Sequence, residues 1–499
     1  MNNIDQTVLQ NLYQILPQAV IEVAERRGDE IYAVGGCIRN LLIGLDVPDI
    51  DFSVVGDAVG YAKELARQEK SGEVATYARF GTALVRLGDH QLEFATSRKE
   101  SYSPESRNPT EVIPVPIDED LKRRDFTMNA MAYGLTGHRK GELIDLFNGQ
   151  QDIADQIVRT PLEPEMTFSD DPLRMLRAIR FAADLGFEIE PITWEGIITS
   201  ASRLQIVVMD RIRGEFWRMM EGRNPVRAVR MLLSCGLMDY IIPELKDLGG
   251  IEQVGKHHHK DVLTHTLKVM QNVVSSSEDP TLRIAALLHD IGKPRSKRFI
   301  PESGWTFHGH EVTGARLANR IARRLTLGKG VTQRLTKLIG LHMRPINLAD
   351  EGVTDHAIRR LMVESGEDID DLLTLCRADI TTANTSLLKR YLTNFDEIER
   401  RIGNVEARDK MRNFHSPIRG EEIMELLELK PGPMVGVFKE RIEDAILDGE
   451  IPYDYDAAKE FLFRIKDDVL STDISKLRSE RKERSRKRRN INGDFQFPQ

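Results

Sequence analysis

The segment Asp49-Ile-Asp51-Phe-Ser-Val-Val constrains this chain more than any other, because alternating acidic and apolar residues are typical of a strand with one buried face. The pattern predicts a buried strand over residues 50–55. Residues two apart on a strand point the same way, so Asp49 and Asp51 would leave one face together. Two aligned carboxylates with no basic neighbour in the segment are costly unless a cation lies between them, and hard oxygen ligands suit Mg²⁺.

A second strand is predicted just upstream, over residues 31–34, and it runs into Gly35-Gly36. Glycines let the backbone turn tightly and approach a phosphate closely at a helix start. A phosphate-binding turn beside two aspartates indicates a metal-dependent nucleotide site.

Glu93 is a third candidate metal ligand. The run from Thr82 to Phe94 predicts two strands about a Gly88-Asp89 turn, which would bring Glu93 beside the aspartate pair. Three carboxylates around two cations suit in-line displacement at a phosphate, where one metal activates a hydroxyl and the other stabilises the departing oxygen. Taken alone, an Asp-x-Asp pair is more often a pair of surface acids.

Three ordered stretches resemble the class II tRNA nucleotidyltransferases and bacterial poly(A) polymerases. They are Gly35-Gly36-Cys-Ile-Arg39 leading to Asp49-Ile-Asp51, Arg123-Arg124-Asp125-Phe-Thr-Met-Asn129, and Asp170-Asp171-Pro-Leu-Arg174-Met-Leu-Arg177-Ala-Ile-Arg180. The nearest form within this family is the CCA-adding enzyme with an appended phosphohydrolase-like domain. The resemblance implies a template-free polymerase that adds C, C and A to tRNA 3′ ends from CTP and ATP with release of pyrophosphate.

The resemblance also implies site residues. It places Asp49 and Asp51 on the catalytic Mg²⁺ ions, with Glu93 assisting, and Arg123, Arg124, Asp125 and Asn129 on the triphosphate and sugar. The full set of expected nucleotide-binding residues is Gly35, Gly36, Arg39, Arg123, Arg124, Asp125, Asn129, Asp171, Arg174, Arg177 and Arg180. Two positions depart from the family pattern: Asn40 replaces an acid and removes its charge, and Asp170 replaces a glutamate.

Asp171 and Arg174 are the expected base-reading pair. Ser169-Asp170-Asp171-Pro172 predicts a helix start, on which Asp171 and Arg174 share a face at i, i+3. A carboxylate only accepts and a guanidinium only donates, so the pair matches an amino donor beside a ring-nitrogen acceptor, the pattern shared by cytosine and adenine. The alternative is an ordinary surface ion pair.

Further arginines recur at every third position, Arg174, Arg177 and Arg180, and suit triphosphate or RNA backbone. The alternative is a solvated basic face.

Residues 97–120 contain four prolines and few apolar side chains, and are predicted to form a loop. In the family such a loop is mobile and helps the switch from adding C to adding A.

The second half of the chain carries histidine and aspartate residues on apolar helical patterns. Their order, His265, His289-Asp290 and Asp379, resembles the ligand set of the HD phosphohydrolase superfamily. Imidazole and carboxylate ligands together suit a transition metal or Mg²⁺ and Mn²⁺. His308, His310 and His342 would widen this site to two metals, whereas a helical domain without chemistry is the alternative. The sequence around His257-His258-His259 is predicted to be an exposed loop.

Composition places the chain in a cytoplasmic class. No apolar run reaches transmembrane length, the first residues lack the pattern of an export signal, and three scattered cysteines are typical of a reducing compartment. The net charge of −8 hides a basic segment at residues 476–490, which is predicted to be a disordered tail that binds RNA or serves solubility.

These observations predict an α+β multidomain chain. The expected parts are a nucleotidyltransferase palm of mixed β-sheet with helices (1–149), an all-α neck and body for base selection and RNA binding (150–248), an all-α HD domain (249–394), a helical tRNA-holding region (395–475) and a basic tail (476–499). Alternative activities are poly(A) addition, partial addition of only CC or only A, and hydrolysis of 3′-phosphate or 2′,3′-cyclic phosphate ends of RNA. An RNA-binding scaffold without activity is disfavoured because both ligand sets are intact.

Overall fold

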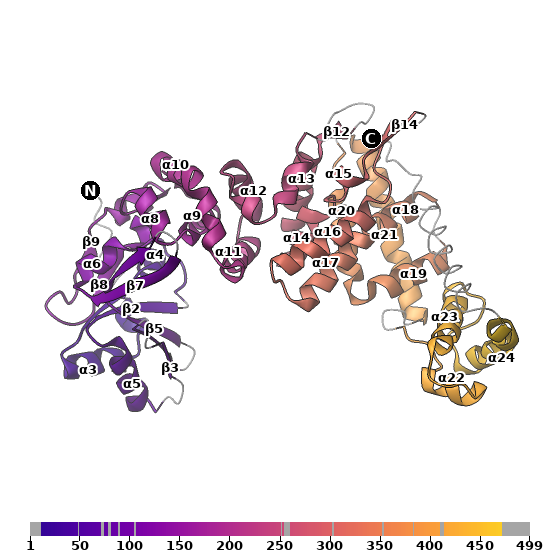
Figure 1. The fold of residues 1–499 in the computed structure, drawn as a ribbon, viewed down its shortest axis with the longest axis horizontal. Coiled ribbons are helices and arrows are strands. Elements are labelled where there is room, and N and C mark those ends of the chain that lie inside the picture. Colours follow the sequence, from indigo (N-terminus) through magenta and orange to yellow (C-terminus); the bar gives the residue numbers. More distant parts are fainter. Residues whose placement is uncertain are drawn as a thin grey trace. The chain divides into compact units, whose positions relative to one another are not determined.

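The computed structural model describes residues 11–47, 49–70, 74–77, 81–87, 90–103, 106–250, 252–253, 260–301, 304–351, 354–382, 384–409 and 414–471. The chain forms two compact units, Met1–Ile241 and Ile242–Gln499, coloured from indigo to yellow along the chain in Figure 1. Among the described helices, none combines the length and the apolar character that a bilayer crossing requires. The Gly88-Asp89 turn, the three histidines at 257–259 and the basic tail lie outside the described residues.

A seven-stranded mixed sheet forms the centre of the first unit, in the order β3-β4-β5-β2-β1-β8-β9. The strands at 31–34 and 50–55 and the two strands flanking residues 88–89 are confirmed. Only β2 and β5 run parallel; every other neighbouring pair is antiparallel. The strands are β1 (Glu30–Val34), β2 (Asp49–Val55), β3 (Val74–Tyr77), β4 (Thr82–Leu87), β5 (His90–Thr96), β8 (Met131–Gly134) and β9 (Leu143–Asp145).

Both faces of this sheet are packed by helices. On one face the rings of Phe52 and Phe94 stack with centroids 4.7 Å apart, and Tyr61 of α5 (Ala58–Gln68) covers them. On the other face Tyr32 and Val34 form a core with α6 (Ile117–Lys122). Alternation along β2 puts Asp49 and Asp51 on this second face, where both remain exposed at the start of the strand.

Residues 97–120 do not form the predicted loop. They form the antiparallel hairpin of β6 (Arg98–Ser103) and β7 (Ser106–Pro114), followed by α6. Prolines discouraged a strand prediction, but in a two-stranded sheet every strand is an edge, and a proline there can leave its missing hydrogen bond on the open side.

The remainder of the first unit is mainly helical. Helix α9 (Leu173–Leu185) buries its apolar side and packs against α11 (Met209–Glu221) and α12 (Pro225–Ser234). The other elements are α2 (Leu12–Ile15), α3 (Gln18–Arg27), α4 (Gly36–Leu42), η2 (Thr127–Asn129), α7 (Gly149–Ala154), β10 (Ile157–Val158), α8 (Pro164–Asp170), β11 (Glu188–Ile189), α10 (Pro191–Ser200), η3 (Ala201–Ile206) and η4 (Leu237–Tyr240).

The second unit is an array of helices with two short hairpins. Its elements are η5 (Pro243–Leu248), β12 (Glu252–Gln253), β13 (Lys260–Asp261), α13 (Val262–Val274), α14 (Pro280–Leu288), α15 (Lys293–Ser296), β14 (Arg298–Ile300), β15 (Gly304–Thr306), α16 (His310–Arg324), α17 (Lys329–Leu341), α18 (Met343–Glu351), α19 (Asp355–Ser365), η6 (Gly366–Asp368), α20 (Ile369–Asp379), α21 (Thr385–Asp409), α22 (Gly420–Leu427), α23 (Pro433–Leu447) and α24 (Tyr455–Ser471). The predicted helices after residue 395 are present, and Pro431-Gly-Pro433 separates α22 from α23 as expected.

Candidate functional sites

Three carboxylates meet where β2 begins. In the parallel register Asp51 lies opposite Glu93, one strand over, and Asp49 lies two residues before it on the same face. Although Asp51 is accessible to solvent, the protein packed around it displaces part of its hydration and raises its pKa, an effect that Asp49 reinforces and Arg124 opposes. Glu93 also has a raised pKa, through burial first and then the charge of Asp51. Mutual repulsion among hard oxygen ligands is the condition that a divalent cation relieves, so these side chains fit such an ion.

Gly35 sets the distance between this cluster and α4. Its φ of +77° is strained for other residues, and a side-chain Cβ built there would lie 3.1 Å from Arg124 Nη1 and 3.8 Å from Asp51 Oδ2. The double-glycine turn predicted from sequence therefore permits the close approach of Arg124 to the carboxylates.

Asp120, which the sequence analysis missed, holds both predicted triphosphate arginines. Its buried carboxylate accepts hydrogen bonds from Arg123 Nε at 2.9 Å, Arg124 Nη2 at 3.1 Å and the backbone N–H of Arg98 at 3.3 Å. Burial alone raises the pKa of Asp120, but Arg124 and Arg123 lower it below its usual value. No sequence signal distinguished this acid from its neighbours Asp118 and Glu119.

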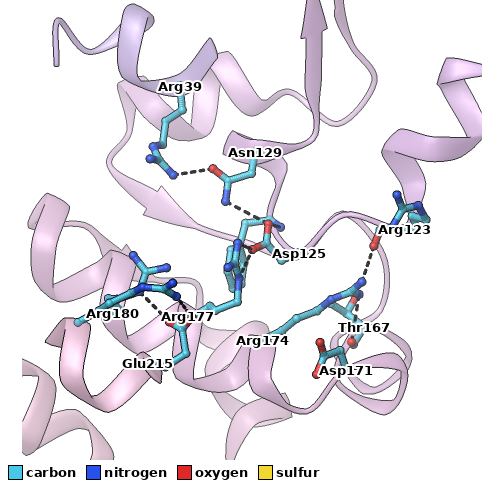
Figure 2. A network of polar contacts seen from close by, with 12 residues as sticks. Arg39, Arg123, Asp125, Asn129, Thr167, Asp171, Arg174, Arg177, Arg180 and Glu215 are labelled. Atoms are coloured by element: carbon cyan, nitrogen blue, oxygen red, sulfur yellow. Dashed lines mark hydrogen bonds and ion pairs between the residues drawn. The ribbon is translucent and has the colours of Figure 1, made fainter. Parts of the chain in front are cut away.

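A chain of polar contacts joins the motifs, as Figure 2 shows. Arg39 Nη1 donates to Asn129 Oδ1 at 2.7 Å, Asn129 Nδ2 donates to Asp125 Oδ1 at 3.0 Å, and Arg177 Nε donates to Asp125 Oδ2 at 2.8 Å. Although burial opposes ionisation of Asp125, Arg177 and Asn129 bring its pKa down to about 2. These residues, far apart in sequence, therefore form one buried network.

The arginines of α9 do not form a solvated basic face. Arg180 Nε donates at 2.7 Å to Glu215, which is buried on α11 and also accepts from Arg218. The guanidinium groups of Arg39, Arg177 and Arg180 also lie 4.8, 5.4 and 4.3 Å from the centre of the Phe181 ring. Glu215 and Phe181 were not predicted as site residues, because each also contacts an arginine from another helix: Arg180 in the case of Glu215 and Arg39 in the case of Phe181.

The predicted base-reading pair lines a pocket of about 510 Å³. Asp171 lies between α8 and α9 and caps α9 by accepting from Leu173 N at 3.1 Å, which confirms the helix start, while Asp170 is the last residue of α8. Arg174 donates to the carbonyls of Thr167 and Arg123 at 3.2 and 2.5 Å. The pocket is lined by Arg123, Arg124, Asp125, Asp171, Leu173, Arg174, Arg177, Asp210, Arg211, Gly214, Glu215 and Arg218.

Arg211 is a further pocket residue that the sequence analysis missed. Its guanidinium forks onto Asp171, with Nη2 at 2.7 Å from Oδ2 and Nη1 at 3.2 Å from Oδ1. A bidentate pair fixes the plane of the carboxylate. Arg211 thereby holds Asp171 in one orientation inside the pocket.

Asn40, a departure from the family pattern, uses both ends of its amide. The oxygen accepts from Arg39 Nε and Nη2 at 3.1 and 2.7 Å, and the nitrogen donates to the carbonyl of Asp46 at 2.9 Å. An aspartate could make only the first two contacts because a carboxylate does not donate.

The second unit gathers six metal-ligating side chains in a buried centre. They form two groups, His265, His289 and Asp379, and Asp290, His310 and His342, with the ligand atoms of each group within 4.8 Å of one another. The four residues expected to be ligands, and two of the three expected to widen the site, thus come together from α13, α16, α20 and the ends of α14 and α17. His308, in contrast, is exposed and belongs to neither group.

Contacts at Nδ1 orient four of the histidine rings. Nδ1 of His289, His310 and His342 lies 2.8, 3.0 and 2.7 Å from the carbonyl three residues earlier, and Nδ1 of His265 lies 3.0 Å from Thr381 Oγ1. A ring that donates through Nδ1 presents a bare Nε2, the usual arrangement of a metal-bound histidine. Nε2 of His310 and Nε2 of His342 are 3.2 Å apart, a separation that two ligands about 2.0–2.1 Å from one ion would have at an angle of roughly 100°.

Electrostatics in this centre also fits a cation. Burial lowers the pKa of His310 to about 3 and that of His342 to about 4, so both are neutral and can ligate near pH 7. Burial alone would lower the pKa of His289, but Asp290 and Asp379 raise it to about 10. The buried Nε2 of His289 lies 3.2 Å from Asp290 Oδ2 and 3.5 Å from Asp379 Oδ1. Imidazole nitrogens and carboxylate oxygens gathered in this way suit divalent ions.

Three family models match the chain: the poly A polymerase head domain over residues 31–159, a probable RNA and SrmB-binding site of polymerase A over 186–248, and the HD domain over 262–384. An A-adding tRNA nucleotidyltransferase of Deinococcus radiodurans is 31% identical over 433 residues, 84% of this chain and 92% of that protein. A multifunctional CCA protein of Nitrosococcus oceani is 33% identical over 308 residues, 60% of this chain and 71% of that protein. The solved structure of a CCA-adding enzyme without ligands has the same fold, with a TM-score of 0.60 at 20% identity over 91% of this chain and 97% of that one.

Proposed function

The chain belongs to the tRNA nucleotidyltransferase family, and on that premise we propose that it adds C, C and A to tRNA 3′ ends from CTP and ATP, releasing pyrophosphate. The observation that carries this proposal is the register of β2 and β5, which pairs Asp51 with Glu93 beside Asp49. Arg124, close to the same carboxylates, also lines the neighbouring pocket.

In this proposal Asp49, Asp51 and Glu93 hold two Mg²⁺ ions. When bound, the ions lower the pKa of the attacking 3′ hydroxyl and stabilise the departing pyrophosphate oxygen. Arg123 and Arg124, both tethered by Asp120, supply forked donors to the triphosphate. The buried network from Arg39 to Arg177 fixes the positions of Asp125 and Arg177, which both line the nucleotide pocket.

Base selection is assigned to Asp171 and Arg174. A carboxylate acceptor and a guanidinium donor match cytosine and adenine but not guanine and uracil. The bidentate contact from Arg211 fixes the orientation of the Asp171 carboxylate. A carboxylate that cannot rotate discriminates better between bases, because its acceptor atoms stay in one position.

The decisive experiment incubates the protein and Mg²⁺ with tRNA ending before its CCA, and with tRNA already ending in CC. Labelled CTP, ATP, GTP or UTP is supplied singly, and CTP with ATP together, with products resolved at single-nucleotide length. Two C residues followed by one A, with no use of G or U, are expected. An open ladder of A would instead identify a poly(A) polymerase.

A second candidate is addition of A alone. It is favoured by the relative from Deinococcus radiodurans, an A-adding enzyme matched over 92% of its length. In the same assay an A-adding enzyme would extend only the tRNA that already ends in CC and would leave CTP unused.

We also propose that the six-ligand centre of the second unit hydrolyses terminal 3′-phosphate or 2′,3′-cyclic phosphate on RNA. Buried imidazole and carboxylate ligands fit two divalent ions of undetermined identity. To test this assignment, release of phosphate and opening of a cyclic end are measured for the wild-type protein and for His289→Ala. The wild type should catalyse one or both reactions. His289→Ala should lose them but should still add nucleotides to tRNA.

The remaining expectations follow from the same premise. We propose a cytoplasmic location, supported by three buried free cysteines. The helical region at residues 395–475 is proposed to hold the tRNA, and the basic tail to add non-specific RNA affinity. The domain boundaries at residues 149, 248, 394 and 475 stand as part of this proposal.

A further inference from the structure

Two aromatic rings stand exposed on the hairpin that connects the ligand-bearing segments of the second unit. Phe299 on β14 and Trp305 on β15 are directly opposite each other, with 61% and 41% of their surface exposed. Directly opposed residues share one face of a hairpin. Their rings meet edge to face with centroids 5.4 Å apart, and in Figure 1 the β14 hairpin projects beyond the helices of its unit.

One cation lies against this pair, and two more are exposed nearby in the sequence. Lys297 places its Nζ 4.6 Å from the centre of the Trp305 ring, and Arg295 and Arg298 are exposed close by in the chain. Exposed aromatic surface is costly in water, and its combination with flanking cations is the arrangement that binds single-stranded nucleic acid. Bases stack on the rings, while lysine and arginine contact the phosphates.

The hairpin is tied to the buried centre at both ends. Before β14, Lys293 donates to Asp290 Oδ2 at 2.7 Å; after β15, the carbonyl of Phe307 lies 3.0 Å from Nδ1 of His310. Trp305 is five positions before His310, so the Cα atoms of these two residues lie within about 18 Å of each other by chain reach. A strand of a few nucleotides stacked on the hairpin can therefore reach the centre with its end.

We propose that Phe299 and Trp305 form a stacking platform that binds the unpaired 3′ end of an RNA and presents its terminal phosphate to the histidine–aspartate centre. This rests on the proposed action of that centre on RNA ends, and it adds the substrate's single-stranded segment as the recognised element. A free mononucleotide, too short to span both places, gains little from the platform.

Photocrosslinking tests the platform without requiring turnover. The full-length protein is irradiated with a ten-nucleotide RNA that carries 5-iodouridine near its 3′ end and a 3′-terminal phosphate. Mass spectrometry should place the crosslink on Phe299 or Trp305. Crosslinks confined to other segments would overturn the proposal.

Substitution gives the second measurement. The double variant Phe299→Ala with Trp305→Ala should raise KM for hydrolysis of the same RNA end at least tenfold, because stacking contributes about 1–3 kcal/mol per base. Phe299→Tyr should retain the wild-type value. Hydrolysis of bis(p-nitrophenyl) phosphate should stay unchanged, and so should addition of nucleotides to tRNA.

Tyr77→Ala provides the matched control, since Tyr77 has a comparable exposure of 57% but lies in the first unit. An equal effect of the control and the double variant on KM would contradict the platform. If the wild type hydrolyses neither RNA ends nor the small phosphodiester, the phosphohydrolase proposal fails, and the crosslink alone then decides whether the hairpin binds RNA.

Discussion

Asp51 and Glu93 lie directly opposite each other on β2 and β5, the one parallel pair of strands in the described part of the seven-stranded sheet. In a parallel pair, facing residues project to the same side, so a register shift of one residue would separate these carboxylates. The apolar stack of Phe52 on Phe94, one residue further along both strands, fixes that register from the opposite face. The packing of the core thus sets the geometry of the acidic cluster.

Asp51→Asn should abolish nucleotide addition. A carboxylate that holds a catalytic cation contributes several kcal/mol to the transition state, so kcat should fall at least about a hundredfold. Because Asp51 is exposed, the melting temperature and tRNA affinity should stay close to wild type. The effect is measured by single-turnover addition with products resolved on a gel. Glu69→Gln serves as the control, because Glu69 is an exposed acid at the end of α5.

Glu93→Gln should produce a smaller loss than Asp51→Asn, since it keeps one ligand oxygen and removes one charge. Titration of Mg²⁺ should show that more metal is needed for half-maximal addition. A Mg²⁺ requirement equal to that of the wild type would exclude Glu93 from the metal site.

Arg211→Lys should weaken the use of both CTP and ATP. An ammonium cannot reproduce the two-pronged contact with Asp171, and loss of a charge-assisted fork of about 1.5 kcal/mol corresponds to a roughly tenfold rise in KM. Misincorporation of GTP and UTP should increase as the carboxylate gains freedom. Arg213→Lys on the same helix should behave as wild type; an identical profile for both variants would reject a role for Arg211 in selection.

Asp125 should make the first unit sensitive to acid. Its pKa falls from the ordinary 3.8 to about 2 in the folded state, so its ionised form stabilises the fold above the unfolded pKa. That contribution, about 2 kcal/mol, is lost as pH falls from about 4 through about 2. Asp125→Asn should therefore be less stable than wild type at pH 7 in urea unfolding, with the difference closing across that window. A gap that is the same at pH 3 and pH 7 would refute the ionic contribution.

Metal content should follow the two ligand groups. Protein purified without chelator should contain two divalent ions in the second unit, and His342→Gln should lower that number to one by elemental analysis. His308→Gln, an exposed neighbour, should retain both ions. Retention of two ions by His342→Gln would remove that residue from the ligand set.

Local patterns predicted the elements whose side chains alternate or repeat. The acidic and apolar alternation in β2 could be recognised because it follows from the geometry of one strand, and the ordered histidines and aspartates of the second unit because they resemble a known ligand set. The β6–β7 hairpin was missed because β7 contains two prolines, and whether such a strand forms depends on the partner with which it pairs and not on its own sequence alone.

Residues that contact a motif from a remote part of the sequence could not be recognised from a local pattern. Arg211 reaches Asp171 from another helix forty positions away, and nothing in its own sequence marks it. His308 and His310 look alike in sequence, but Gly309, with a φ of +75°, lies between them just before α16, and only His310 is buried. Such distinctions arise from packing between helices.

Three imidazoles have Nδ1 close to the carbonyl three residues earlier: His289 and His342 at the ends of their helices, and His310 at the start of α16, against the turn just before it. Each ring is oriented by a contact within one turn of the chain, with or without an ion. The helical unit should consequently fold first and be loaded afterwards, unlike domains in which metal binding itself supplies the folding energy. In a cell short of metal, the second unit would then be folded with its six ligands in place and no ion bound, and the first unit would be folded as well.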